Sequence, residues 1–319
     1  MRNWKNSEAH ILLLSKFLKP ESPSKYIDSE SWKEILKEKP LKAIKRFIRE
    51  GCLIEAELKD RLDHKFTVRE LKSILKDKGI QASGKKLDLI NELILTNESY
   101  AKRISDNVEV YICSSAITPL LKNYLDTKRT EEEILVKSVI ESIEANSYEK
   151  ACHLVADYNA KQFFPKGINH DWENYNHTHD VQVLNEIFNH TPKRLLDLPK
   201  EKIHVLKIAA ALKHLFDEST VRDYLPDDFN VDLDINFQTA LNLFWIRAMR
   251  QASIENYRKN KDILIGVEIV CVENACDECR KLSGITYSFD EDIPIPDDFC
   301  TNKKGCRCVY IPKVIYKPK

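Results

Sequence analysis

The sequence predicts a mainly α-helical, multi-domain protein with a small β-rich module at its C-terminus. Three observations support this fold class. Only 7 of the 319 residues are glycine, whereas leucine, isoleucine, lysine and glutamate are abundant, and this composition favours helices. Apolar residues recur at helical spacing along most of the chain and alternate with a period of two only after Gly266. Most of the cysteines gather after residue 275, which indicates a separate metal-stapled module.

The overall composition limits the functional classes. The formal net charge is 0, so any contact with nucleic acid must come from a local basic patch. The longest apolar runs, such as Ile11–Leu14, are far too short to cross a membrane, and we expect no membrane association. The N-terminus lacks the apolar stretch of a secretory signal. An odd number of cysteines with a CxxC pair favours a reducing, cytoplasmic compartment.

We divide the chain into four parts. Residues 1–28 are expected to form an N-terminal lead and linker, and residues 29–98 a helical region that contains a basic module. Residues 99–262 predict a helical middle domain, and residues 263–319 a β-rich module built around the cysteines. Within the second part we expect an amphipathic helix over 31–38. A second helix is expected to start at Pro40, because proline suits the first helical turn.

The segment over residues 66–96 predicts two short helices joined by a tight loop. Thr67 and Glu70 have the spacing of a capping box, in which a hydroxyl and a carboxylate each satisfy a free amide at a helix start. Gly79 supplies the left-handed residue that ends the first helix, and Ser83-Gly84 is expected to begin the second. The apolar residues of both helices recur at helical spacing: Val68, Leu71, Ile74, Leu75, Leu87, Ile90, Leu93 and Ile94.

This segment is also basic. Seven basic and two acidic residues between Lys65 and Lys86 give a local charge of +5. Because the apolar stripe occupies one face of each helix, the lysines must project from the other face and from the loop. A second helix that opens with Ser-Gly-Lys-Lys offers free amides beside two ammonium groups, which suits a backbone phosphate. The alternative is the solvated face of an ordinary helical hairpin.

The order Val68-x-x-Leu71-Lys-x-x-Leu75-x-x-x-Gly79-Ile80-x-x-Ser-Gly84-Lys-Lys resembles the SAP domain, a helix-extended-helix DNA-binding module. The resemblance implies binding to the backbone or minor groove of double-stranded DNA with a preference for AT-rich duplex. Some SAP modules bind proteins instead, which leaves protein binding as an alternative. In this sequence the resemblance assigns the DNA contacts to six residues: Lys72, Lys76, Lys78, Ser83, Lys85 and Lys86.

The middle domain carries weaker signals. Thr130-Glu-Glu-Glu133 has the form of another capping box, Ser147 is expected to cap a helix that runs to Lys161, and the last helix is expected over about residues 236–261. A polar stretch between these helices could form a metal site or a general acid–base pair, although polar loops often collect such side chains. Its candidates are Asn169, His170, Asp171, His177, His179 and Asp180.

The C-terminal cysteines predict a structural Zn²⁺ site. Cys276 and Cys279 form a CxxC knuckle, and further cysteines return at positions 300, 306 and 308. Four of these five suffice for a closed, tetrahedral site without a position for catalytic water. We favour Cys300 and Cys306 as the second pair, because Cys306 and Cys308 lie too close together in an extended segment to chelate one ion comfortably. Cys308 is then a packed thiol, or the ligand in place of Cys300. A rubredoxin-like iron is the alternative metal.

The same region resembles the C-terminal end of phage head-morphogenesis (Mu F-like minor capsid) proteins. The resemblance rests on a helix, Gly266-Val267, the CxxC pair, Leu282-Ser-Gly-Ile-Thr-Tyr287 and Cys306-Arg-Cys308. Where that family has His-Pro-x, this chain has Lys303-Lys-Gly305, so Cys300 would replace the histidine. The resemblance implies a structural protein that contacts the portal and DNA during packaging. We expect strands at about 267–271, 285–287 and 309–311.

Together these features predict a non-enzymatic, DNA-associated protein of phage, prophage or mobile-element type, located in the bacterial cytoplasm or the virion. The basic module would bind duplex DNA, the middle domain would support a homo-oligomer, and the zinc module would contact a protein partner. One alternative is a DNA-acting enzyme such as a nuclease, whose metal-binding carboxylates would be Asp290, Glu291, Asp292, Asp297 and Asp298. A second alternative is a pure assembly protein that does not bind DNA.

Overall fold

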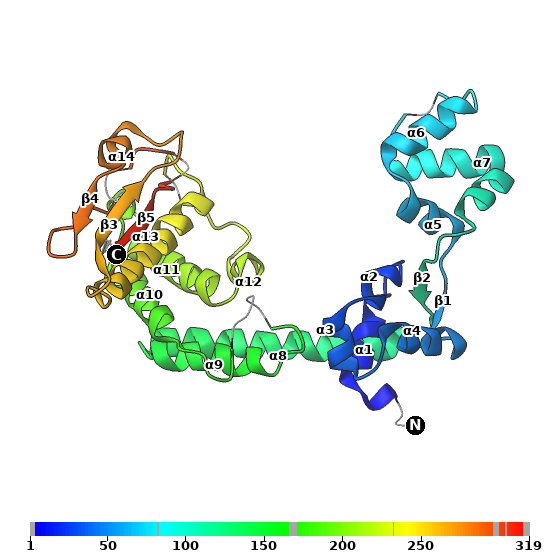
Figure 1. Ribbon diagram of the computed structural model, residues 1–319, viewed down its shortest axis with the longest axis horizontal. Helices are drawn as coiled ribbons and strands as arrows, with labels where there is room; N and C mark the ends of the chain where they lie inside the picture. Colours follow the sequence, from blue (N-terminus) through cyan, green and yellow to red (C-terminus); the bar gives the residue numbers. More distant parts are fainter. Residues whose placement is uncertain are drawn as a thin grey trace, which may run out of the picture. The chain divides into compact units, whose positions relative to one another are not determined.

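The computed structural model describes residues 4–81, 83–165, 171–231, 233–295, 300–303 and 305–314 (Figure 1). The described chain is mainly helical and carries small antiparallel sheets, which confirms the predicted mainly-α class. It divides into two compact units, Met1–Glu131 and Glu132–Lys319. Each unit has its own apolar clusters. Among the described residues, no helix combines the length and apolarity needed to cross a membrane.

The first unit begins with a cluster of short helices. Leu13, Leu14 and Phe17, from the segment interpreted as a lead, are fully buried and pack in one cluster with Trp32 and Phe47. The N-terminal segment therefore belongs to a core, because its apolar side chains fill the space between the helices that follow. The helices are η1 (Trp4–Asn6), α1 (Glu8–Ser15), α2 (Ser24–Ile27), α3 (Glu30–Leu36) and α4 (Pro40–Arg49).

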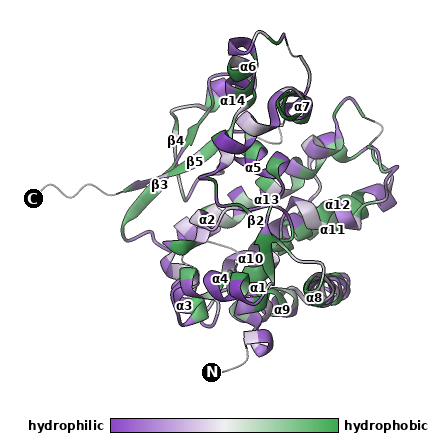
Figure 2. Ribbon diagram, turned by 90° about the vertical axis from the view of Figure 1, so that its right-hand side faces the viewer, coloured by the Kyte–Doolittle hydropathy of each residue, from purple (hydrophilic) through white to green (hydrophobic). Residues whose placement is uncertain are grey.

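A two-stranded ladder frames the basic module. Strand β1 (Leu53–Glu55) pairs antiparallel with β2 (Tyr111–Cys113). The chain between these strands forms helices α5 (Leu58–Lys65), α6 (Val68–Asp77) and α7 (Lys86–Ser105). Figure 2 shows hydrophobic and hydrophilic residues along both α6 and α7, as expected for helices with one buried face. The three helices share a separate core of Leu62, Leu71, Leu75, Leu89, Ile90, Leu93 and Ala101.

One predicted helix start is wrong. Thr130, expected to begin a helix with Glu133, lies inside the long helix α8 (Thr118–Glu144). The pattern Thr-x-x-Glu marks a helix start only where the preceding residues leave the helical conformation, and no glycine or proline separates Thr130 from the turns before it. The downstream helix begins close to the predicted place, as α9 (Tyr148–Ala160) with Ser147 in the capping position.

Helices α10 and α11 of the second unit both pack on α13. Helix α13 begins after Asn236, whose side chain accepts a hydrogen bond from the amide of Thr239 (2.9 Å). It therefore matches the predicted last helix to within a few residues. The elements of this bundle are α10 (Thr178–Asn189), η2 (Lys193–Leu195), α11 (Lys200–Leu215), α12 (Glu218–Tyr224) and α13 (Phe237–Arg258).

The C-terminal module is a three-stranded antiparallel sheet in the order β4-β3-β5, and its three strands overlap the predicted ones. Ile254 of α13 shares a cluster with Val267, Ile269 and the cysteines, so the sheet packs on this helix (Figure 1). The module comprises β3 (Leu264–Val270), α14 (Asp277–Leu282), β4 (Thr286–Ser288) and β5 (Val309–Val314).

Candidate metal centre and basic helical hairpin

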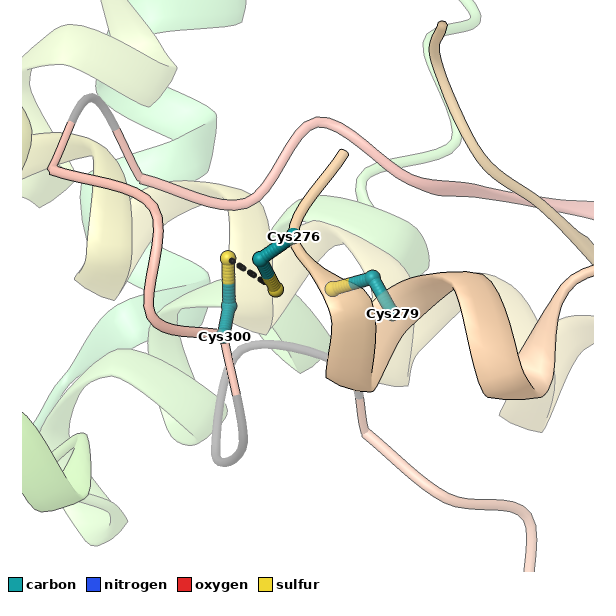
Figure 3. A group of neighbouring side chains, drawn as sticks. All are labelled: Cys276, Cys279 and Cys300. Atoms are coloured by element: carbon teal, nitrogen blue, oxygen red, sulfur yellow. Dashed lines mark hydrogen bonds between the residues drawn. The ribbon is translucent and has the colours of Figure 1, made fainter. Parts of the chain in front are cut away.

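The five cysteines predicted as metal ligands come together at one end of the C-terminal sheet. Cys276 occupies the N-cap of α14 and Cys279 lies in the first turn of that helix. The other three come from the segment that leads into β5. Figure 3 shows the sulfurs of Cys276 and Cys300 pointing toward one another, with the sulfur of Cys279 beside them. All 9 cysteines of the chain are free thiols, and the cluster has the composition and spacing of a metal-binding site.

Two of the distances between the sulfurs equal the edge of a metal-centred tetrahedron. The Sγ atoms of Cys276 and Cys300 lie 3.8 Å apart, and those of Cys279 and Cys306 also lie 3.8 Å apart. A tetrahedron with metal–sulfur bonds of about 2.3 Å has edges of about 3.8 Å. Cys276, Cys279 and Cys300 have all their sulfurs within 4.8 Å of one another. Cys306 belongs with Cys279 and Cys308 to a second such group, so Cys279 joins the two groups and Cys306 must approach Cys276 and Cys300 for one ion to bind all four.

The fifth cysteine has a different neighbour. The Sγ atom of Cys308 lies 2.9 Å from that of Cys271, at the end of β3. The backbone amide of Ile269 donates to the carbonyl of Ile285, and its carbonyl accepts from the amide of Gly284, both on the side of β4. Ile269 therefore forms a non-hydrogen-bonded pair with Tyr310 of β5. Two residues further along, Cys271 faces Cys308 in a pair of the same type, which brings side chains closest together. Cys308 remains within 4.8 Å of Cys279 and Cys306.

The thiols of the cluster differ in acidity. Burial opposes ionisation of Cys276, but hydrogen bonds from the backbone of Cys279 and Thr301 outweigh it and lower its pKa to about 6. A hydrogen bond from Cys300 and the charge of Arg250 lower the pKa of Cys306 to about 5, against the effect of burial. Burial and the charge of Cys306 raise the pKa of Cys279 to about 12. Cys276 and Cys306 are therefore the more acidic thiols of the cluster, and a metal that binds thiols must displace their protons.

Two arginines from the helical bundle hold the backbone of the ligand segment. Arg250 of α13 is buried and donates a hydrogen bond from Nη2 to the carbonyl of Cys306 (3.3 Å). Arg194 of η2 donates from Nη1 to the carbonyl of Asn302 (2.9 Å). These contacts position the segment between Cys300 and Cys306 from outside the module. They are the kind of supporting interactions that orient metal ligands.

The basic module has the predicted helical hairpin. Thr67 and Glu70 form the expected capping box, with the Thr67 amide donating to Glu70 Oε2 at 2.7 Å. Gly79 adopts the left-handed conformation, with φ of 76°. Of the six residues assigned to DNA contact, five are exposed: Lys72, Lys76, Lys78, Ser83 and Lys85. The sixth, Lys86, is half-buried and pairs with Asp63 Oδ1 at 3.1 Å.

The second helix of the hairpin starts later than predicted. Helix α7 begins at Lys86, with Lys85 in the N-cap position, and not at Ser83-Gly84. The reason is Asp88, whose Oδ2 accepts a hydrogen bond from the Lys85 amide at 2.8 Å and closes a capping box. The carboxylate thus occupies part of the place that the sequence analysis assigned to a phosphate. The exposed lysine side chains of the hairpin have no such carboxylate in the N-cap position of α7 to displace, and they project into solvent.

The described part of the polar stretch, residues 171–180, leads into α10. Asp180 is half-buried between two partners: His214 Nε2 lies 3.0 Å from its Oδ1, and the Tyr175 hydroxyl donates to its Oδ2 at 2.6 Å. These hydrogen bonds keep the pKa of Asp180 below its usual value, although burial opposes this. Burial and the nearby charge of His214 lower the pKa of His179. Asp171 lies apart from these groups in contact with Asn174.

Three functional candidates were missed by sequence reasoning. Glu149 and His153 lie four residues apart on α9 and approach His177. Their spacing within a predicted helix was the signal that could have found them, because residues at i and i+4 share a face. His214 comes from a different helix and has no such signal.

The carboxylates considered for a nuclease lie in ordinary surface contacts. Asp290 is exposed and pairs with Lys261 (2.8 Å), and Glu291 accepts a hydrogen bond from the Ser288 amide at 3.0 Å. Asn169, His170, Asp297 and Asp298 lie outside the described residues.

Comparison with known proteins adds no relative: no protein-family model, curated protein or solved structure matches this chain.

Proposed function

We propose that this chain is a non-enzymatic, DNA-associated assembly protein of phage, prophage or mobile-element type. Its C-terminal module is stapled by a structural Zn²⁺, and its basic hairpin binds duplex DNA. The observation that carries the proposal is the cysteine cluster, whose two sulfur pairs at 3.8 Å have the edge length of a zinc tetrahedron. An all-thiolate site of this kind stabilises a module and leaves no open position for chemistry.

The zinc ligands in this proposal are Cys276, Cys279, Cys300 and Cys306. Cys308 is the packed thiol, since its sulfur lies closest to Cys271. Zinc is favoured over iron because the site is a helix-capping CxxC knuckle and a returning loop in a sheet, the arrangement of zinc ribbons. The metal would join α14 to the segment before β5, two segments that otherwise share few backbone hydrogen bonds in the described chain.

Duplex DNA is the proposed ligand of the basic hairpin. Leu71 and Leu75 of α6 are fully buried, whereas the neighbouring Lys72 and Lys76 are exposed, so the lysines lie on a face that the core does not use. The ammonium group of Lys78 lies 4.2 Å from the centroid of the Tyr100 ring, which places one loop charge over α7. About five phosphate contacts would give log K a slope near −4.5 against log salt.

A protein partner is proposed for the outer face of the C-terminal sheet. Val309 and Ile311 of β5 are about half exposed and pair in register with Val270 and Glu268 of β3. Side chains at alternate strand positions share a face, so these residues lie opposite Tyr310 and Ile269, which are buried. In the proposed role this surface docks on another capsid-type protein or on a second copy of the chain, in the bacterial cytoplasm or the virion.

The proposal is tested on purified full-length protein by metal analysis and by DNA binding at low and moderate salt. We expect one tightly held zinc per chain, and duplex binding that weakens steeply with salt without strand cleavage. Metal-dependent DNA cleavage would favour the enzymatic alternative. Zinc without DNA binding would leave an assembly protein whose hairpin binds protein. Absence of tightly held metal would overturn the structural zinc site.

A further inference from the structure

We propose a second metal site, formed by Glu149, His153 and His177, that binds a divalent transition-metal ion of the Zn²⁺ type and retains an open coordination position. This site is separate from the cysteine cluster, and it does not depend on the function proposed above. It lies in the helical bundle of the second unit, between the first turns of α9 and the start of α10.

The backbone places the three donors together. Glu149 and His153 are four residues apart on α9, so their side chains project from one face of that helix. His177 occupies the N-cap position of α10. One donor atom from each of the three side chains lies within 4.8 Å of the other two. The rings of His153 and His177 approach to 4.0 Å between centroids, with their planes at 58°.

The contact between Glu149 and His177 fits a shared ion better than a direct hydrogen bond. The His177 Nε2 and Glu149 Oε1 atoms lie 3.5 Å apart, which is long for a hydrogen bond to a carboxylate. Two ligands with bonds of about 2.0–2.1 Å to one tetrahedral ion lie about 3.4 Å apart.

The position of His177 is fixed by its surroundings. Its side chain is 19% exposed, and its Nδ1 atom is buried with no hydrogen-bond partner among the described residues. This leaves Nε2 as the nitrogen that faces the other donors. Three residues further along α10, Asp180 is held by His214 and Tyr175, which anchors the first turn of the helix. His177 therefore sits at the N-cap of a helix whose first turn is held in place, which limits the movement needed to bind an ion.

The opposite side of the site is open. Glu149 and His153 are exposed, so the ion would be reached directly from solvent. Two imidazoles and one carboxylate form the donor set typical of ions that keep one position for water, and a bound Zn²⁺ lowers the pKa of such a water to about 7. This chemistry differs from that of the closed cysteine cluster, where four sulfurs fill the coordination shell. The ion bound by Glu149, His153 and His177 would therefore exchange with solvent, whereas the ion of the cysteine cluster would stay bound.

Calorimetric titration of Zn²⁺ into full-length protein, whose metal content as purified is measured first, tests this assignment. The wild-type protein should bind a further equivalent. His153→Ala, His177→Ala and Glu149→Gln should each weaken this second event by more than about tenfold, while the cysteine-bound equivalent is retained. Cobalt provides an independent readout, because only thiolate-bound cobalt gives intense sulfur-to-metal charge-transfer absorption.

Matched variants keep the test specific. His204 is exposed and lies 3.8 Å from Glu144, so His204→Ala and Glu144→Gln remove similar groups away from the site and should leave both binding events unchanged. Circular dichroism and tryptophan fluorescence confirm that each variant is folded. The site is refuted by a wild-type protein that binds no second equivalent. It is equally refuted by second binding that survives His153→Ala/His177→Ala or is lost in the control variants.

Discussion

The guanidinium of Arg250 donates a hydrogen bond to the backbone carbonyl of Cys306, with an Nη2–O distance of 3.3 Å. Arg250 lies on α13, and Cys306 lies 56 residues later in the segment that completes the cysteine cluster. This contact connects the helical bundle directly to the candidate metal centre. It also places a positive charge near the Cys306 thiol, which favours its ionised form.

Removing this arginine should weaken both the fold and the metal site. We expect Arg250→Ala to lower the free energy of unfolding of the second unit by about 1.5–3 kcal/mol, the range for a hydrogen bond to a charged group. Urea titration followed by tryptophan fluorescence, to which Trp172 and Trp245 of the second unit contribute, measures this change, and a competing chelator should remove zinc faster from the variant. Arg222, exposed on α12, provides the control Arg222→Ala, which should change neither quantity. Equal changes in unfolding free energy and zinc release in both variants would contradict a specific link between Arg250 and the metal centre.

The four proposed zinc ligands can be separated from the other cysteines by substitution. Cys279→Ser and Cys306→Ser should abolish stoichiometric zinc, because each removes one of four thiolates. Cys271→Ser and Cys308→Ser should retain about one zinc per chain, since their sulfurs face one another. Metal analysis after gel filtration reports the ratio directly. Loss of zinc in Cys308→Ser, with retention in Cys300→Ser, would show that Cys308 is the zinc ligand and Cys300 the packed thiol.

Gly266 is expected to be intolerant of any side chain. A Cβ atom at this position would lie 2.1 Å from the carbonyl oxygen of Tyr287 on the paired strand β4, so Gly266→Ala must separate β3 from β4. We expect a loss of more than about 2 kcal/mol in stability, comparable to other severe steric substitutions. Gly284→Ala is the comparison: it meets no atom within 4 Å but has φ of +79°, and should cost about 1 kcal/mol. Thermal unfolding of both variants measures which substitution lowers the stability more.

The exposed lysines of α6 should determine the salt dependence of DNA binding. Lys72→Ala/Lys76→Ala should lower the slope of log K against log salt by about 2, or about 1 for each lost phosphate contact. Fluorescence anisotropy with a labelled duplex over a series of salt concentrations measures this slope. The double variant Lys25→Ala/Lys33→Ala removes two exposed lysines from α2 and α3 and should leave the slope unchanged. An identical slope in the α6 variant would show that DNA does not contact this face.

The Asp180–His214 pair should make stability depend on pH. The folded-state pKa of Asp180 is lowered, so its ionised form stabilises the folded protein at pH above the unfolded-state value of about 3.9. That contribution is lost as pH falls below about 4 toward the folded-state pKa. Urea unfolding of wild type and Asp180→Asn should therefore differ at pH 6 and converge as the pH is lowered. A constant difference across this range would contradict the assignment.

Local sequence patterns were sufficient for the helical hairpin and for the membership of the cysteine cluster. The Thr67–Glu70 capping box and the left-handed Gly79 occur as predicted, because short-range hydrogen bonds and backbone conformation determine both. The CxxC pair and the returning cysteines also meet as expected. Where a pattern allowed two conformations, sequence reasoning failed: Thr130 lies within a helix, and Asp88 moved the start of α7.

The sequence by itself determined the mainly helical class, the basic hairpin and the presence of a candidate metal centre, since each depends on residues close together in the chain. Only the tertiary structure decided which sulfurs face one another, that Leu13, Leu14 and Phe17 belong to a core, and that His177 meets α9. These relationships join residues far apart in the sequence. They depend on helix packing and strand register, which a local pattern of residues does not specify.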